Sequence, residues 1–282
     1  MTTATSATAP STPYVPTQGR RPRFSDLMAA EWTKIRSVRS TVWTYIIFAV
    51  VTIGITALIT WLTESHWYGP HAAARNATFL SDPTGGILDA AVFFGQLVIG
   101  VLGVLVISTE YTTGVIRASL LAVPRRLHML AAKLVVFTAL LFVVAEVVCF
   151  CSFFIGSAIL HSHLPVSLGD HNVTRAVIGT GLYLTVIGIF SLAIGALIRH
   201  TAGGIATTLG SMFLLPIFGP LLPSSWGAHV NAYLPEQAGA VISHVNQPAD
   251  QLLSAWQGLG VLCIWAAVLL IAAAILLQRR DA

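Results

Sequence analysis

Few side chains in this sequence have types and spacing that suit chemistry, and two of these few lie inside long apolar runs. They are Glu146 and Gln96. A carboxylate in a hydrocarbon environment is costly, so Glu146 is expected to have a role there. The alternatives are an interhelix hydrogen bond, with Gln96 as the candidate partner, a contact to a substrate cavity, and a proton site. We favour the hydrogen bond, because polar side chains of this kind commonly join transmembrane helices.

Catalytic and metal-binding patterns are missing from the sequence. The apolar runs hold no Ser/His pair, no paired carboxylates and no set of three metal ligands. His161 and His163 fall in a polar segment, where we expect a solvated loop and not a metal site. A phosphate-binding P-loop needs a glycine directly before its lysine, and neither lysine of the chain, Lys34 or Lys133, follows one. We therefore expect no catalytic residue, no metal, no cofactor and no ATP hydrolysis in this chain.

The stretch 108–129 combines charged residues with residues that shape the backbone. Its pattern reads Glu110-x-x-x-Gly114-x-x-Arg117, then Pro124-Arg125-Arg126. The apolar residues between these charges are too few to cross a membrane. We expect residues 115–122 to form a short helix that begins at a turn permitted by Gly114 and ends before Pro124. A short, rigid segment of this kind suits docking into the groove of a partner.

Composition predicts which elements hold these residues. Hydrophobic types make up 55% of the 282 residues and charged types only 9%, against about 25% charged in soluble domains. These values exclude a soluble globule and a disordered chain. Pro216 and Pro220 predict a kink or unwinding late in the fifth apolar run. We expect an all-α polytopic membrane protein with six spans, at about 42–62, 88–107, 130–160, 173–198, 202–222 and 259–277.

The basic residues predict the orientation of these spans. If both termini are cytoplasmic, thirteen of the fifteen Lys and Arg residues lie on the cytoplasmic side, and only Arg75 and Arg175 lie outside. This bias follows the positive-inside rule. We therefore expect a multi-pass protein of the bacterial cell (inner) membrane, with both termini and the loop 108–129 in the cytoplasm. The basic charge then reflects topology and does not indicate a nucleic-acid partner.

Two segments of different kinds precede the first span, and residues 42–282 form the transmembrane domain. Residues 1–23 are rich in Thr, Ser, Ala and Pro, which predicts a disordered cytoplasmic tail. Residues 24–41 have an apolar face at helical spacing, which predicts an amphipathic helix on the membrane surface. Lys34 is expected to face water or lipid headgroups. Glu31 interrupts the apolar face, so either its charge snorkels from a lipid-lying anchor or it pairs with a docked partner.

Three parts of the sequence together resemble the permeases of the type-2 ABC exporter family, actinobacterial members in particular. They are the loop pattern above, the segment Ala30-Glu31-Trp32-Thr33-Lys34-Ile35-Arg36-Ser37-Val38-Arg39-Ser40, and the ending Gln278-Arg279-Arg280-Asp281-Ala282. The resemblance covers Phe24 to Ala282. It implies six transmembrane helices, a dimer of permeases, and a separate cytoplasmic ATPase that holds ATP and Mg. It assigns ATPase coupling to Glu31, Glu110, Tyr111, Gly114, Arg117, Pro124, Arg125 and Arg126.

The resemblance predicts a permease subunit that forms the translocation path of an ATP-driven exporter, in a homodimer or a heterodimer within the lipid bilayer. The competing interpretation is a stand-alone secondary transporter or channel, which would require several intramembrane charges. Individual residues also have simpler explanations. Arg117, Arg125 and Arg126 would serve as positive-inside charges, and Glu110 would pair within the chain with Arg117 or Lys133.

Overall fold

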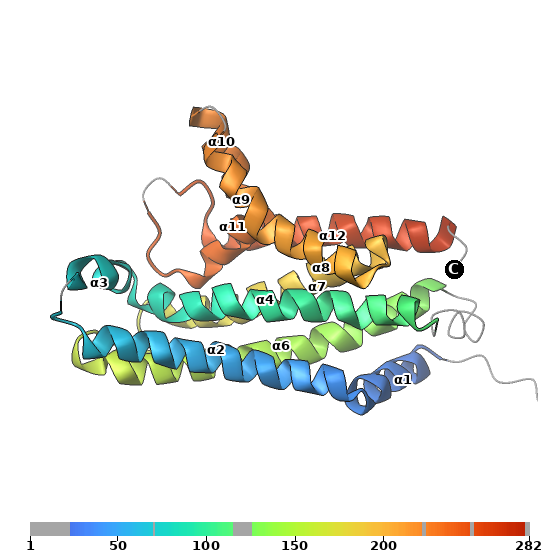
Figure 1. The fold of residues 1–282 in the computed structure, drawn as a ribbon, viewed down its shortest axis with the longest axis horizontal. Coiled ribbons are helices and arrows are strands. Elements are labelled where there is room, and N and C mark those ends of the chain that lie inside the picture. The colour runs from blue at the N-terminus through green and yellow to red at the C-terminus, as the bar shows by residue number, and fades with distance from the viewer. Residues whose placement is uncertain (1–22, 70, 115–125, 222–223, 249–250, 280–282) are drawn as a thin grey trace, which may run out of the picture.

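The protein is a bundle of long helices, as a computed structural model shows (Figure 1). The structure describes residues 23–69, 71–114, 126–221, 224–248 and 251–279. Within these ranges there is no β-strand, and six helical segments are long and apolar enough to cross a membrane. The expected all-α, six-span architecture is therefore confirmed. Residues 1–22 of the expected tail and the expected short helix at 115–122 lie outside the described residues.

Five of the spans are continuous helices, and the fifth in chain order is broken. The continuous spans are α2 (Arg39–Ser65), α4 (Pro83–Thr112), α6 (Arg126–Ile159, extended by the 3₁₀ turn η1, Leu160–Ser162), α7 (Val173–Ile198) and α12 (Ala255–Arg279). The 34 residues of α6 give a length of about 50 Å, more than a bilayer core requires. This long helix therefore extends beyond the hydrocarbon region or tilts within it.

The broken span runs from Thr201 to Phe218 and consists of three pieces. The helix α8 (Thr201–Leu209) leads into a π-helical turn, η2 (Gly210–Leu214), and then into α9 (Leu215–Phe218) and the 3₁₀ turn η3 (Gly219–Leu221). Pro216 occupies the first turn of α9. Because proline has no backbone N–H to donate to the preceding turn, the regular hydrogen-bond ladder cannot pass through it. The run is therefore interrupted where the sequence predicts a kink or unwinding, by the π-helical turn just before Pro216.

The N-terminal amphipathic helix ends earlier than the sequence predicts. The helix α1 covers Phe24–Ser37, and Val38 has an extended backbone with φ −81° and ψ 101°. The helix α2 begins at the next residue, so the predicted continuous element 24–41 is divided by an elbow at Val38. The inward face of α1 also differs from the predicted apolar stripe, because Glu31 and Ile35 are buried while Trp32 is exposed.

The centre of the bundle is the pair α4 and α7, whose buried face is unusually close-packed. Ala91, Ile99 and Leu102 of α4, and Tyr183, Leu184 and Ile187 of α7, are almost fully buried. A Cβ atom added to Gly103 of α4 would lie 2.5 Å from the carbonyl oxygen of Gly188 on α7. The two backbones therefore approach each other at a distance that only glycine permits.

Two ends of the bundle are defined by the elements gathered there (Figure 1). We call the end with α1 and the described C-terminus of α12 the α1 end. The opposite, α3 end holds α3 (Ala72–Ser81) and the start of α4, with α10 (Ser224–Ala232), α11 (Pro235–Ala240) and the turn η4 (Val241–Ser243) nearby. The helix α10 projects away from the bundle, whereas Ala238 and Ile242 of α11 and η4 are buried.

A network around Asp82 fixes the α3 end. The Asp82 carboxylate accepts hydrogen bonds from the backbone N–H groups of Gly85, at 3.1 Å, and Val245, at 2.9 Å. It also lies 3.3 Å from Nδ1 of His244. The guanidinium of Arg175 donates to the carbonyl oxygens of Ile242 and His244, at 3.1 and 2.8 Å. The start of α4 is therefore joined to the segment around η4, 163 positions later in the chain.

Candidate functional site

Four charged side chains meet at the α1 end of the bundle, where three helices converge. Nζ of Lys133, on α6, lies 2.6 Å from Oε2 of Glu31 on α1 and 2.9 Å from Oε1 of Glu110 on α4. Nζ of Lys34 contacts Oε1 of the same Glu110 and lies 3.5 Å from Oε1 of Glu31. We call Glu31, Lys34, Glu110 and Lys133 the charge cluster. It uses both lysines of the chain and has no net charge.

The cluster is buried, and this burial makes its pairing necessary. The side chains of Lys133, Glu110 and Glu31 are only 3%, 7% and 11% exposed, whereas that of Lys34 is 35% exposed. A buried charge without a partner is strongly destabilising, so each carboxylate requires an ammonium nearby. Burial lowers the pKa of Lys34, but the hydrogen bonds and charges of Glu110 and Glu31 outweigh burial and leave that pKa above its ordinary value. Lys34 therefore stays charged at neutral pH.

The cluster joins both flanks of residues 115–125 to the N-terminal helix. Glu110 lies in the last turn of α4, shortly before that stretch, and Lys133 lies two turns into α6, shortly after it. Glu31 and Lys34 belong to α1, one turn apart. A displacement of either flank would therefore pull on α1 through buried ion pairs.

A second contact holds the end of α4 against α7. The guanidinium of Arg199 lies over the ring of Tyr111, 5.1 Å from its centroid. Arg199 ends α7 in the left-handed conformation, with φ 57°, and its Nη2 donates to the carbonyl oxygen of Leu276 on α12 at 3.3 Å. Cation–π contacts of this kind contribute about 0.5–1 kcal/mol at exposed sites. Arg199 thus connects Tyr111 on α4 with the end of α7 and with α12.

Gly114 ends the described part of this region with a backbone that favours glycine. Its φ is +70°, and its N–H donates to the carbonyl oxygen of Tyr111 at 3.3 Å. A Cβ atom added there would meet no atom of the described residues within 4 Å. The requirement for glycine is therefore conformational and not steric, as at many helix C-termini.

Of the four remaining predicted coupling residues, only Arg126 lies among the described residues. Arg117, Pro124 and Arg125 lie outside the described residues, and Arg126 begins α6. Glu110 contacts Lys133, one of the two intrachain partners considered for it, and the other, Arg117, lies outside the described residues.

Glu31 pairs within the chain and does not snorkel toward water. Lys34 contacts Glu110, which the sequence did not predict, while its side chain remains partly exposed to water. Sequence analysis named Lys133 as a possible partner of Glu110, but it did not predict that Lys34 contacts the same carboxylate.

A cavity of about 500 Å³ lies beside the charge cluster. All four cluster residues line it, together with apolar residues of α1 and α4 and the hydroxyl-bearing side chains of the α1–α2 elbow. Oε2 of Glu110 is buried and has no hydrogen-bond partner among the described residues. The cluster therefore borders space into which its helices can shift.

The two intramembrane polar residues lie in different surroundings from those expected. Gln96 is fully buried, and its Oε1 accepts a hydrogen bond from the hydroxyl of Tyr183 on α7. Glu146 packs against Gly181, where an added Cβ atom would lie 2.5 Å from its carboxyl carbon. Neither carboxyl oxygen of Glu146 has a hydrogen-bond partner within the described part of the chain. The expected Glu146–Gln96 hydrogen bond is therefore not formed, and Tyr183 is the partner that the sequence did not predict.

Comparison with known proteins agrees with this architecture. The family model described as ABC-2 family transporter protein matches residues 27–218, which include most of α1, the charge cluster and five of the six spans. No curated protein matches the chain. The match covers more than half of the sequence and the three helices that meet at the charge cluster. This multi-pass membrane protein is a member of the ABC-2 transporter family, the membrane permeases of ABC transporters.

Proposed function

We propose that this chain is the permease subunit of an ATP-driven exporter and that it couples to separate ATPase subunits through the α1 end of the bundle. The observation that supports the proposal best is the charge cluster. It links α1, α4 and α6 by buried ion pairs around residues 115–125. A docked ATPase that moves this region would move three helices together, because breaking one buried pair is costly.

The partner supplies the chemistry in this proposal. ATP and Mg are held by the ATPase, and the permease contributes no catalytic group. Two permease copies, identical or not, enclose the translocation path, and the α1 end faces the cytoplasm of a bacterial cell membrane. Closure of the ATPases on ATP shifts the equilibrium between inward-open and outward-open states of the dimer, because the two states differ in their contacts at the α1 end.

The test is co-purification of the partner ATPase, sought as a P-loop protein encoded beside this chain. It compares two glycine variants that differ in the backbone conformation of the substituted residue. Gly114→Ala places a side chain at φ +70°, which costs about 1 kcal/mol or more, and should reorient the chain that enters 115–125. Gly54→Ala is the control, since an added Cβ atom has open space at both positions and Gly54 has no such φ. We expect Gly114→Ala to reduce ATPase co-purification and permease-stimulated ATP hydrolysis severalfold.

The control should retain both properties. Equal ATPase capture by the two variants would contradict docking at this end. A separate measurement tests the secondary-transporter alternative. If that alternative is right, vesicles that contain only the purified chain take up substrate when an ion gradient is applied, without ATP or the ATPase.

A further inference from the structure

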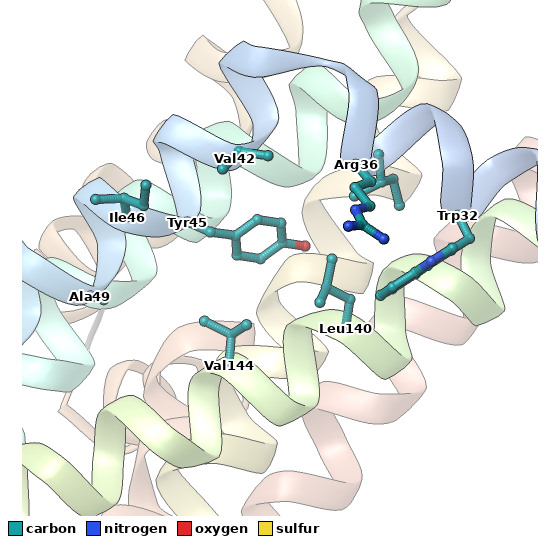
Figure 2. A pocket seen from close by; sticks show the side chains of 9 residues that line it. Trp32, Arg36, Val42, Tyr45, Ile46, Ala49, Leu140 and Val144 are labelled. Atoms are coloured by element: carbon teal, nitrogen blue, oxygen red, sulfur yellow. The ribbon is translucent and has the colours of Figure 1, made fainter.

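A second cavity lies at the elbow between α1 and α2 and faces α6 (Figure 2). Its volume is about 380 Å³, near the lower end of the range for small-molecule sites. Ile35 of α1 lines both this cavity and the one beside the charge cluster, so the two cavities adjoin at this residue. The elbow cavity therefore lies next to the candidate coupling site without including any of its charges.

The cavity is lined almost entirely by apolar atoms, and its one charged lining residue, Arg36, lies at one end. Figure 2 shows Arg36 and Trp32 of α1 at one end and Ala49 of α2 with Val144 of α6 toward the other. On α2 the lining positions are 42, 45, 46 and 49, a spacing that places them on one helix face. That face runs from the start of the span toward the membrane interior. The polarity thus follows the direction of a lipid molecule, with the headgroup at the elbow and the chain below it.

Two polar groups at this cavity, the Tyr45 hydroxyl and the Arg36 guanidinium, have no partner among the described residues. A bound molecule would supply one. Tyr45 is only 9% exposed, and its hydroxyl has no hydrogen-bond partner among the described residues. Figure 2 shows that hydroxyl directed toward Arg36 and Leu140. An unsatisfied buried hydroxyl is unfavourable, so an acceptor atom in the cavity would stabilise it. Arg36 is exposed and forms no ion pair within the described ranges.

The charge at the elbow determines which headgroup fits. A guanidinium binds phosphate oxygens in a bidentate manner. Arg36 is the one charged residue that lines the cavity, and it has no counter-ion among the described residues. The elbow therefore carries surplus positive charge at the level where phospholipid headgroups lie, and an anionic headgroup compensates it better than a zwitterionic one.

We propose that the elbow cavity binds one anionic phospholipid from the leaflet that borders α1. The phosphate lies at Arg36, an ester carbonyl oxygen accepts the hydrogen bond of the Tyr45 hydroxyl, and one acyl chain runs along Ala49 and Val144. The lipid fills the space between α1, α2 and α6, and it thereby holds the helix that carries Glu31. This site does not depend on ATPase coupling, because its residues and ligand are separate from the charge cluster.

The experiment measures lipid binding to the purified full-length chain. Native mass spectrometry and thermal unfolding in detergent are followed while phosphatidylglycerol or phosphatidylcholine of the same acyl chains is added. Arg36→Gln is compared with Arg39→Gln, which removes the same charge at a position that does not line the cavity. Ala49→Phe fills the apolar end. The unmodified chain with the two lipids gives an answer that depends on no variant.

We expect phosphatidylglycerol to bind at least about tenfold more tightly than phosphatidylcholine and to raise the unfolding temperature more. Arg36→Gln should weaken phosphatidylglycerol binding about tenfold, as loss of a charge-assisted hydrogen bond does. Arg39→Gln should leave binding nearly unchanged, and Ala49→Phe should abolish the one-lipid adduct. Equal binding of the two lipids, equal effects of the two arginine variants, or an adduct that survives Ala49→Phe would each overturn the proposal.

Discussion

At the residue scale, Lys133 is the centre of the charge cluster because it contacts both carboxylates at short distance. It lies 2.6 Å from Glu31 and 2.9 Å from Glu110, and its side chain is 3% exposed. Lys34 contacts the same two carboxylates, but its side chain is 35% exposed. Water can replace part of what Lys34 supplies, whereas Lys133 is shielded from water and no other described cation contacts both carboxylates at such short distances. The two lysines therefore make unequal contributions to stability.

Substitution of each lysine by methionine measures this inequality. In Lys133→Met, the buried carboxylates of Glu31 and Glu110 share a single ammonium group, that of Lys34. We expect this substitution to lower the free energy of unfolding by about 3–5 kcal/mol. Lys34→Met should cost clearly less, about 1 kcal/mol, because exposed ion pairs contribute little. The measurement is denaturant or thermal unfolding of the purified protein in detergent.

A second substitution distinguishes charge from packing at the same site. Adding Glu31→Gln to Lys133→Met removes one of the two stranded carboxylates, so the double variant should recover part of the lost stability. If Lys133→Met proves no worse than Lys34→Met, the cluster is not the electrostatic centre that its geometry indicates.

At the scale of elements, the closely packed pair α4 and α7 forms the centre of the bundle. Gly103 is the point where the approach is tightest against backbone atoms, since an added Cβ atom would meet the Gly188 carbonyl oxygen at 2.5 Å and N of Leu192 at 3.0 Å. Backbone atoms of a packed helix cannot move aside as a flexible side chain can. The two helices must therefore separate if the glycine is replaced.

Gly103→Ala should lower the free energy of unfolding by about 1–3 kcal/mol, the usual cost of overpacking a core. Gly260→Ala on α12 is the matched control, because an added Cβ atom there meets nothing within 4 Å. Unfolding of both variants in detergent gives the comparison. Unchanged stability in Gly103→Ala would mean that the helices tolerate separation.

The contact between the segment after η4 and the start of α4 should make the stability of the protein depend on pH. The hydrogen bond to Asp82 raises the pKa of His244, and the charges of Asp89 and Asp82 add to this effect against the opposing effects of burial and Arg175. Burial raises the pKa of Asp82, but the contacts to His244, Gly85 and Val245 outweigh burial and leave it below its ordinary value. The pair is therefore charged across an interval that includes mildly acidic pH.

The sign of the pH dependence follows from the folded state holding the His244 proton more tightly than the unfolded chain. The stabilisation is fully present below the ordinary histidine pKa of about 6.5 and is lost as pH rises through the raised pKa of His244. We expect the unfolding temperature to fall across that interval. His244→Gln should flatten this fall, and His161→Gln, at an exposed position, should not. An identical pH profile for all three proteins would contradict the assignment.

At the scale of the whole molecule, the remaining question is which end faces the cytoplasm. The distribution of Lys and Arg predicts that the α1 end does. Two exposed positions at opposite ends, Thr113 and Gly169, report on this in a variant whose Cys149, Cys151 and Cys263 have been replaced. A membrane-impermeant maleimide should label Gly169→Cys in intact cells and Thr113→Cys only after the membrane is permeabilised. The reverse pattern would invert the proposed topology.

The sequence by itself determined the class of protein and the number of spans. Runs of about 20 apolar residues must become helices in a bilayer, because every backbone polar group has to be satisfied within the segment. Local sequence also predicted the helix interruption near Pro216 and the turn at Gly114. Both effects act within one or two turns, because proline lacks a backbone N–H and glycine tolerates a positive φ.

Only the tertiary structure decided which charges meet. Glu31 and Lys133 are separated by 102 positions, and no periodicity relates residues so far apart. The helical pattern of α1 predicts that Lys34 turns toward water, but it does not predict the contact of this partly exposed side chain with Glu110 on α4. A buried ion pair reverses that preference when helices from distant parts of the chain supply the opposite charges. The same reason explains Gln96, whose partner Tyr183 lies on another helix, and Glu146, whose surroundings are set by Gly181 of α7.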